Sequence, residues 1–95
     1  MDKITSEKLA KYFDVTGRAI NKVKIAKPKE IKWKEAAEDF LDMARRYYAD
    51  AKHFEKKGDI VTAFAALNYA HGWLDAGARL GLFDVDKDSE LFTVD

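Results

Sequence analysis

The sequence predicts an all-α protein, an antiparallel up-and-down three-helix bundle. Apolar residues recur at helical spacing in three segments, and a proline and two glycines separate or end those segments. The connections are short, which favours antiparallel neighbours. We expect helices over about residues 5–26, 30–57 and 60–80, forming one bundle domain of residues 1–83, followed by an acidic C-terminal tail of residues 84–95.

The first predicted helix begins near Thr5 or Ser6, because either hydroxyl can accept a hydrogen bond from a free N–H of the first turn. Its apolar residues lie at helical spacing: Leu9, Tyr12, Phe13, Ile20 and Val23. Pro28 disfavours the helical conformation at Lys27, so the helix is expected to end before this proline.

The second predicted helix carries the strongest periodic signal in the chain. Seven apolar residues alternate at spacings of four and three: Trp33, Ala37, Phe40, Ala44, Tyr47, Ala51 and Phe54. This is an unbroken heptad seam. Leu41 and Tyr48 widen it beyond a two-stranded coiled-coil stripe, toward the broader face of a bundle helix.

The third predicted helix follows a two-residue link, in which Gly58 ends one helix and Asp59 caps the next. Small residues form a row along it: Ala63, Ala66, Ala70 and Gly77. Large apolar side chains flank this row on both sides, so we expect the helix to contact both of the others. Gly81 is its stop signal, and Leu82 or Phe83 is expected to pack back on the helix end. In the tail Leu91 and Phe92 could dock as well, with the rest mobile.

Composition narrows the classes of function. The 95 residues include no cysteine, which excludes disulfides, thiolate nucleophiles and cysteine-based metal sites. No stretch approaches the ~20 apolar residues of a membrane span, and the first residues lack the apolar run of a signal peptide. We therefore expect a cytoplasmic protein with no membrane contact. The abundance of lysine and glutamate and the scarcity of amides give a thermophile-like composition.

Charge is distributed unevenly along the chain, although the formal net charge is zero. Residues 1–34 hold ten Lys/Arg against four Asp/Glu, and residues 35–95 hold seven against thirteen. The first third therefore carries +6 and the remainder −6. This dipolar arrangement is the main electrostatic feature of the sequence.

A specific string in the third helix, Tyr-Ala-His-Gly-Trp-Leu-Asp-Ala-Gly at residues 69–77, is accompanied by Tyr47-Tyr48, Gly58-Asp59 and Arg79-Leu-Gly-Leu-Phe83. With these motifs the chain resembles an archaeal family of small helical-bundle proteins, domain-of-unknown-function family 357, over roughly residues 36–83. The first helix is similar by position and pattern only. The resemblance implies a three-helix bundle and brings no activity, cofactor or catalytic residue.

One candidate polar surface lies on the third helix, with residues of the second helix expected opposite it: Asn68, His71, Asp75, Arg79, Asp42 and Arg46. His71 and Asp75 are four residues apart, as are Asp75 and Arg79, so both pairs can interact. Such a cluster could form a small-ligand or enzymatic site. The alternative is a solvent-facing ladder of ion pairs. One histidine with one carboxylate offers too few ligands for zinc, and we expect no metal, no cofactor and no catalytic residues.

A candidate basic patch surrounds the first connection: Lys22, Lys24, Lys27, Lys29, Lys32, Trp33 and Lys34. Lysines beside an exposed aromatic ring could follow a phosphate backbone and stack on a base. The segment has no arginine and Trp33 begins the heptad seam, so a solvated helix junction or a site for an acidic protein partner are alternatives.

Helical seams without a catalytic set favour a non-catalytic protein-interaction module, with a protein partner or self-association through apolar surface left on the second helix. A nucleic-acid-binding accessory protein that uses the basic segment is the second hypothesis. A small-ligand or enzymatic site around His71 and Asp75 is the third.

Overall fold

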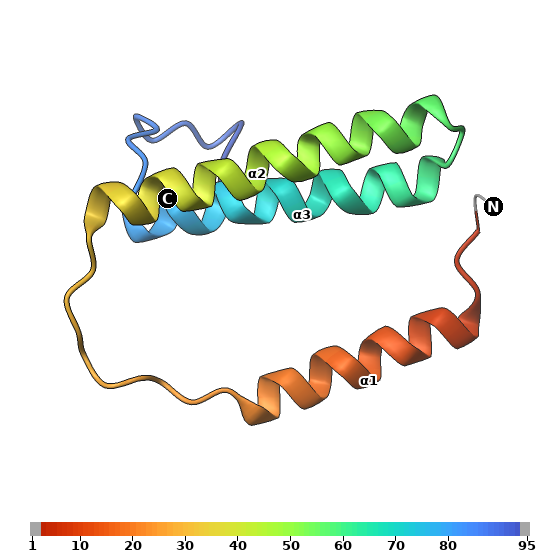
Figure 1. Ribbon diagram of the computed structural model, residues 1–95, viewed down its shortest axis with the longest axis horizontal. Helices are drawn as coiled ribbons and strands as arrows, with labels where there is room; N and C mark the ends of the chain where they lie inside the picture. Colours follow the sequence, from red (N-terminus) through yellow and green to blue (C-terminus); the bar gives the residue numbers. More distant parts are fainter. Residues whose placement is uncertain (1–2, 94–95) are drawn as a thin grey trace.

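The computed structural model describes residues 3–93, which form three helices and no strand (Figure 1). Helix α1 spans Ser6–Lys22, helix α2 spans Trp33–Lys56 and helix α3 spans Ile60–Leu80. The predicted all-α class and the three successive helices are confirmed. Helices α2 and α3 pack against each other as an antiparallel hairpin.

The hairpin turns at the two residues that the sequence indicates. Gly58 has a φ of +80°, which a glycine adopts without steric cost. The N–H of Asp59 donates to the carbonyl of Phe54 at 3.0 Å and closes helix α2. The Asp59 carboxylate then accepts from the N–H of Thr62 at 3.1 Å and begins helix α3. Hydrogen bonding with Thr62, through its side chain and its backbone, lowers the pKa of Asp59 below its ordinary 3.8.

Small residues form the buried seam between α2 and α3: Ala44, Ala51, Ala63, Ala66 and Ala70. They let the two backbones approach closely, and aromatic rings pack beside them. The rings of Phe40 and Trp73 meet edge to face at 4.9 Å, and those of Tyr47 and Tyr69 at 4.4 Å. The hairpin therefore has its own aromatic and alanine core.

Helix α3 ends as expected. Gly81 has a φ of +86°, and the N–H of Leu82 donates to the carbonyl of Gly77 at 2.8 Å. Leu82 is buried, and the ring of Phe83 lies against Gly77. Both residues thus pack back on the helix end, which turns the C-terminal segment over the hairpin on the side away from α1 (Figure 1).

Helix α1 lies apart from the hairpin (Figure 1) and packs closely against neither of its helices. None of its residues is buried. The radius of gyration is 15.9 Å, against about 13 Å for a compact chain of ~100 residues. The prediction that α3 contacts both other helices is therefore wrong, because α3 packs on α2 alone. Between α1 and the hairpin is an open cleft of about 690 Å³.

The position of α1 follows from a longer connection than the sequence predicts. Helix α1 ends at Lys22 rather than near residue 26, and α2 begins at Trp33 rather than near residue 30. Val23 is already extended, with a ψ of 143°, and β-branched residues such as Val23 and Ile25 favour extended backbone. The linker of residues 23–32 is thus ten residues long. The predicted link of three residues, 27–29, would hold α1 against α2, whereas the ten-residue linker lets α1 stand apart.

Candidate functional site

His71 and Asp75 lie on one face of α3, one helical turn apart. The Nε2 atom of His71 is 3.5 Å from Oδ1 of Asp75. The His71 side chain is 51% exposed and that of Asp75 is 27% exposed. The predicted contact between these two residues is confirmed, and Asp75 is its more enclosed member.

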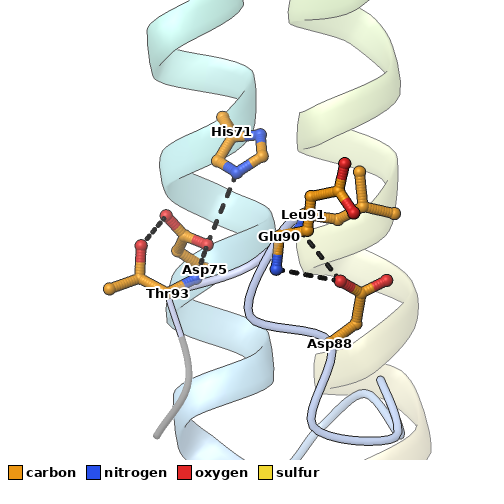
Figure 2. Close-up of polar contacts among 6 residues, drawn as sticks. All are labelled: His71, Asp75, Asp88, Glu90, Leu91 and Thr93. Carbon is orange, nitrogen blue, oxygen red and sulfur yellow. Dashed lines mark hydrogen bonds and ion pairs between the residues drawn. The ribbon is translucent and has the colours of Figure 1, made fainter.

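The C-terminal segment runs beside this pair and contacts Asp75 (Figure 2). The backbone N–H of Thr93 donates to Oδ1 of Asp75 at 2.9 Å, and its hydroxyl donates to Oδ2 at 3.1 Å. The ring of Phe92 is stacked beside that of His71, with ring centres 6.3 Å apart and an interplanar angle of 24°. Both oxygens of Asp75 are therefore engaged by the protein's own tail.

A turn centred on Asp88 brings the tail back to α3. Its Oδ1 accepts from the N–H groups of Glu90 and Leu91, both at 3.0 Å (Figure 2). Aspartate side chains often form turns of this kind. The expected docking of Phe92 is confirmed, and the tail contacts α3 through Phe92 and Thr93. That the rest of the tail is mobile stays a prediction. Residues 94 and 95 of the predicted tail lie outside the described part.

The other members of the candidate polar surface are not brought into this cluster. Oδ2 of Asp42 pairs with Nε of Arg46 at 2.9 Å within helix α2, and both side chains are more than half exposed. Among residues 3–93, Asp75 contacts Thr93 and His71 rather than Arg79. The predicted pairing of Asp75 with Arg79 is therefore wrong. Thr93 supplies two hydrogen bonds to Asp75, one to each oxygen.

Asn68 and Arg79 lie on opposite sides of the His71–Asp75 pair along α3, and both are exposed. Asn68 lines a groove between α2 and α3. Arg79 lines a hollow formed with the start of the tail, beside Asp84 and Asp86. Asn68 and His71 therefore share the groove, whereas Arg79 lies in a different hollow.

The candidate basic patch is exposed throughout, from Lys22 to Lys34. Lys32 lies 4.0 Å from Glu35 and Lys34 lies 3.8 Å from Glu38, both as exposed ion pairs at the start of α2. The side chain of Trp33 is 49% exposed. The linker therefore presents its lysines to solvent as an exposed basic segment without regular secondary structure.

Sequence reasoning missed Thr93 as a partner of Asp75 and missed the groove as a feature. The groove has a volume of about 540 Å³. Its apolar lining comes from both helices of the hairpin: Leu41, Ala44, Tyr48, Leu67, Ala70 and Leu74. The groove could have been predicted from Leu41 and Tyr48, because these two residues extend the apolar face of the second helix beyond the heptad seam.

Residues 3–93 hold neither a metal-binding cluster nor a membrane-spanning helix. No three histidine, aspartate or glutamate side chains gather closely enough to hold a metal ion. No helix in this part of the chain combines the length and apolar character needed to cross a bilayer.

Comparison with curated proteins and with solved structures gave no match. A protein-family model does match, over residues 11–83, and its description is "Protein of unknown function (DUF357)". The match reaches further toward the N-terminus than the resemblance over residues 36–83, and it takes in most of α1, the linker and the whole hairpin. The chain belongs to the DUF357 family of proteins of unknown function.

Proposed function

We propose that this chain is a non-catalytic protein-interaction module that associates with a second copy of itself through helix α1. One observation carries the proposal: α1 has a one-sided apolar face that its own chain leaves uncovered. Leu9, Tyr12 and Phe13 of this face are 51%, 56% and 72% exposed. Contiguous exposed apolar surface of this kind is typical of interaction sites.

Helix α1 also needs a partner for its own stability. An isolated helix of 17 residues is marginal in water, since nucleation is costly and packing normally supplies most of the stability. The walls of the cleft offer suitable contacts, because Leu9 and Tyr12 of α1 face Tyr47 and Phe54 of the hairpin across it. A second copy presents the same apolar wall.

The distribution of charge also favours a second copy of the chain as the partner of α1. Residues 1–34 carry +6 and residues 35–95 carry −6, so the N-terminal segment of one copy is attracted to the hairpin and tail of another. The ten-residue linker gives α1 the reach to dock outside its own chain. Exchange of an identical element between two copies is a low-cost route to a dimer.

The surroundings of His71 and Asp75 support a non-catalytic role. Phe92 and Thr93 occupy the positions beside these side chains that a substrate would need. Asp75, the carboxylate that would orient the histidine as a general base, has both oxygens engaged by Thr93.

Light scattering on the full chain over a wide concentration range tests the proposal. We expect a mass above the 10.8 kDa of one chain as the concentration rises. Phe13→Ser should restore the monomer, whereas Val15→Ser should not, because Val15 lies about 200° around the helix from Phe13. A parent chain that stays monomeric at every concentration would contradict the proposal.

Nucleic-acid binding through the basic segment is a second candidate, favoured by the exposure of Lys24, Lys27 and Lys29 beside the half-exposed Trp33. Such binding would be electrostatic and would fall steeply with salt. Fluorescence anisotropy with labelled single-stranded and duplex DNA and RNA tests it. Absence of binding even at ~20 mM salt, where screening is weak, would end this candidate.

A further inference from the structure

The hairpin has two apolar faces, and a single α1 can cover only one of them. The cleft beside α1 is lined by Tyr47, Phe54 and Tyr69. The groove defined above is lined by different residues, among them Tyr48 and Leu67. Adjacent residues of a helix point about 100° apart, so Tyr47 and Tyr48 face different sides. An α1 seated on the cleft therefore leaves the groove uncovered.

The groove has the spacing of a helix-binding surface. Leu41 and Tyr48 are seven residues apart on α2, and Leu67 and Leu74 are seven apart on α3. Seven helical residues span about 10.5 Å. A helix with apolar anchors at positions i, i+3 or i+4, and i+7 covers the same distance, as in known helix-in-groove complexes. Tyr48 is 52% exposed and Leu67 is 43% exposed, so both are accessible to such anchors.

The charged side chain that lines the groove is positive and comes from α2. Arg45 is its only charged lining residue among the described residues, and no carboxylate lines it. Lys52, one turn beyond Tyr48, lies with its Nζ atom 5.3 Å from the centre of the Tyr48 ring. Arg45 and Lys52 therefore form a local cationic patch on the α2 side of the groove, within a hairpin and tail that are acidic as a whole, and this patch attracts an acidic partner.

The chain's own tail contacts one end of the groove. His71 lines one end of the groove, and Phe92 is stacked on it. Phe92 follows Glu90 and Leu91 in an acidic and apolar segment. An aromatic side chain is thus accommodated at this end of the groove, beside the bond from Thr93 to Asp75.

We propose that the groove between α2 and α3 binds an acidic amphipathic helix of a protein partner, with leucine or aromatic anchors over Tyr48 and Leu67 and carboxylates facing Arg45 and Lys52. This inference rests on the proposed function, since both treat the chain as an interaction module. It adds a second surface and the chemistry of a second partner.

The experiment uses two fluorescent helical peptides of about 18 residues, long enough to present anchors over two turns. Both carry leucine and phenylalanine at the anchor positions. One carries glutamate on its polar face and the other carries lysine in the same places. Anisotropy with the full chain at ~50 mM salt should show the acidic peptide binding at least about tenfold more tightly than the basic one.

Two charge reversals at adjacent positions provide the matched control. Arg45→Glu should weaken binding of the acidic peptide by about tenfold or more. Arg46→Glu makes the same change in charge, but Arg46 pairs with Asp42 outside the groove, so binding should stay within about twofold. Leu67→Ser should also weaken binding, with circular dichroism confirming that the hairpin is folded.

Several outcomes would overturn the inference: no binding of either peptide, a preference for the basic peptide, or equal losses from the two reversals. Competition by unlabelled chain that is abolished by Leu67→Ser would identify the occupant as a second copy and would also overturn it. Self-association through α1 is measured separately, as the mass of the parent and of Phe13→Ser. Failure of peptide binding alone therefore leaves the proposed function standing.

Discussion

The ring of Phe83 lies over Gly77 so closely that no β-carbon would fit between them. Gly77 is buried in α3, and the turn at Gly81 places Phe83 on it. We predict that Gly77→Ala destabilises the protein by about 1 kcal/mol. Overpacking costs ~1–3 kcal/mol and exceeds the ~1 kcal/mol that alanine contributes through helix propensity. Urea unfolding measures the difference.

Gly72 provides the matched control for this prediction. It lies in the same helix, is exposed, and has open space where a β-carbon would stand. Gly72→Ala should therefore stabilise the protein by up to ~1 kcal/mol. In a Phe83→Ala background the penalty of Gly77→Ala should disappear. A penalty that persists there would show that the contact with Phe83 is not its cause.

A second prediction concerns Asp75 and the tail. Asp75→Ala removes both hydrogen bonds from Thr93 and the contact with His71. We expect a loss of about 1 kcal/mol in unfolding free energy, because these contacts are partly exposed. A buried ion pair would instead lose ~3–5 kcal/mol. The tail should detach, and hydrogen exchange at the Thr93 amide should accelerate.

Asp42→Ala is the control for Asp75→Ala. It removes the same charge from an ion pair with Arg46 on the outer side of α2, so Thr93 exchange should be unchanged. A Thr93 amide that exchanges at the parent rate in Asp75→Ala would mean that other contacts hold the tail.

The links of the hairpin could be predicted from the sequence because their signals are local. Gly58, Asp59 and Gly81 act within one turn of their own positions, through backbone conformation and capping. The contact of His71 with Asp75 was predictable for the same reason, since helical spacing alone brings residues four apart together.

The position of α1 and the partner of Asp75 could not be predicted in this way. An apolar stripe such as that of Leu9 and Phe13 shows which face of a helix is apolar, but not which surface covers it. The contact between Thr93 and Asp75 joins residues 18 positions apart through an irregular segment. No periodic pattern encodes such a contact, because it depends on the turn at Asp88.

A third prediction concerns acid unfolding. Hydrogen bonding with Thr62 lowers the pKa of Asp59 below 3.8 in the folded state. The ionised carboxylate therefore contributes stability above the unfolded pKa, and this contribution is lost as the pH falls through the lowered folded pKa. Asp59→Asn keeps a capping oxygen but cannot titrate. Its melting temperature should therefore fall less than that of the parent between about pH 6 and pH 2.5.

Thr62→Val serves as a partial control for Asp59→Asn. It removes the hydroxyl of Thr62 but keeps the N–H that donates to Asp59, so its acid sensitivity should lie between those of the parent and Asp59→Asn. Equal acid sensitivity in all three proteins would place the acid-labile interaction elsewhere.

The last prediction concerns a substitution at Gly17, which tests whether α1 is separate from the hairpin. This residue lies in the middle of α1 with open space at its β-carbon position. Gly17→Ala should favour the helical state of α1 by about 1 kcal/mol. Because α1 does not pack on the hairpin of its own chain, dilute protein should gain helical circular dichroism without a change in the melting temperature of the hairpin.

At high concentration the melting temperature should rise, because a better ordered α1 strengthens association and association stabilises the folded state. A rise of equal size at all concentrations would instead mean that α1 unfolds together with its own hairpin as one cooperative unit.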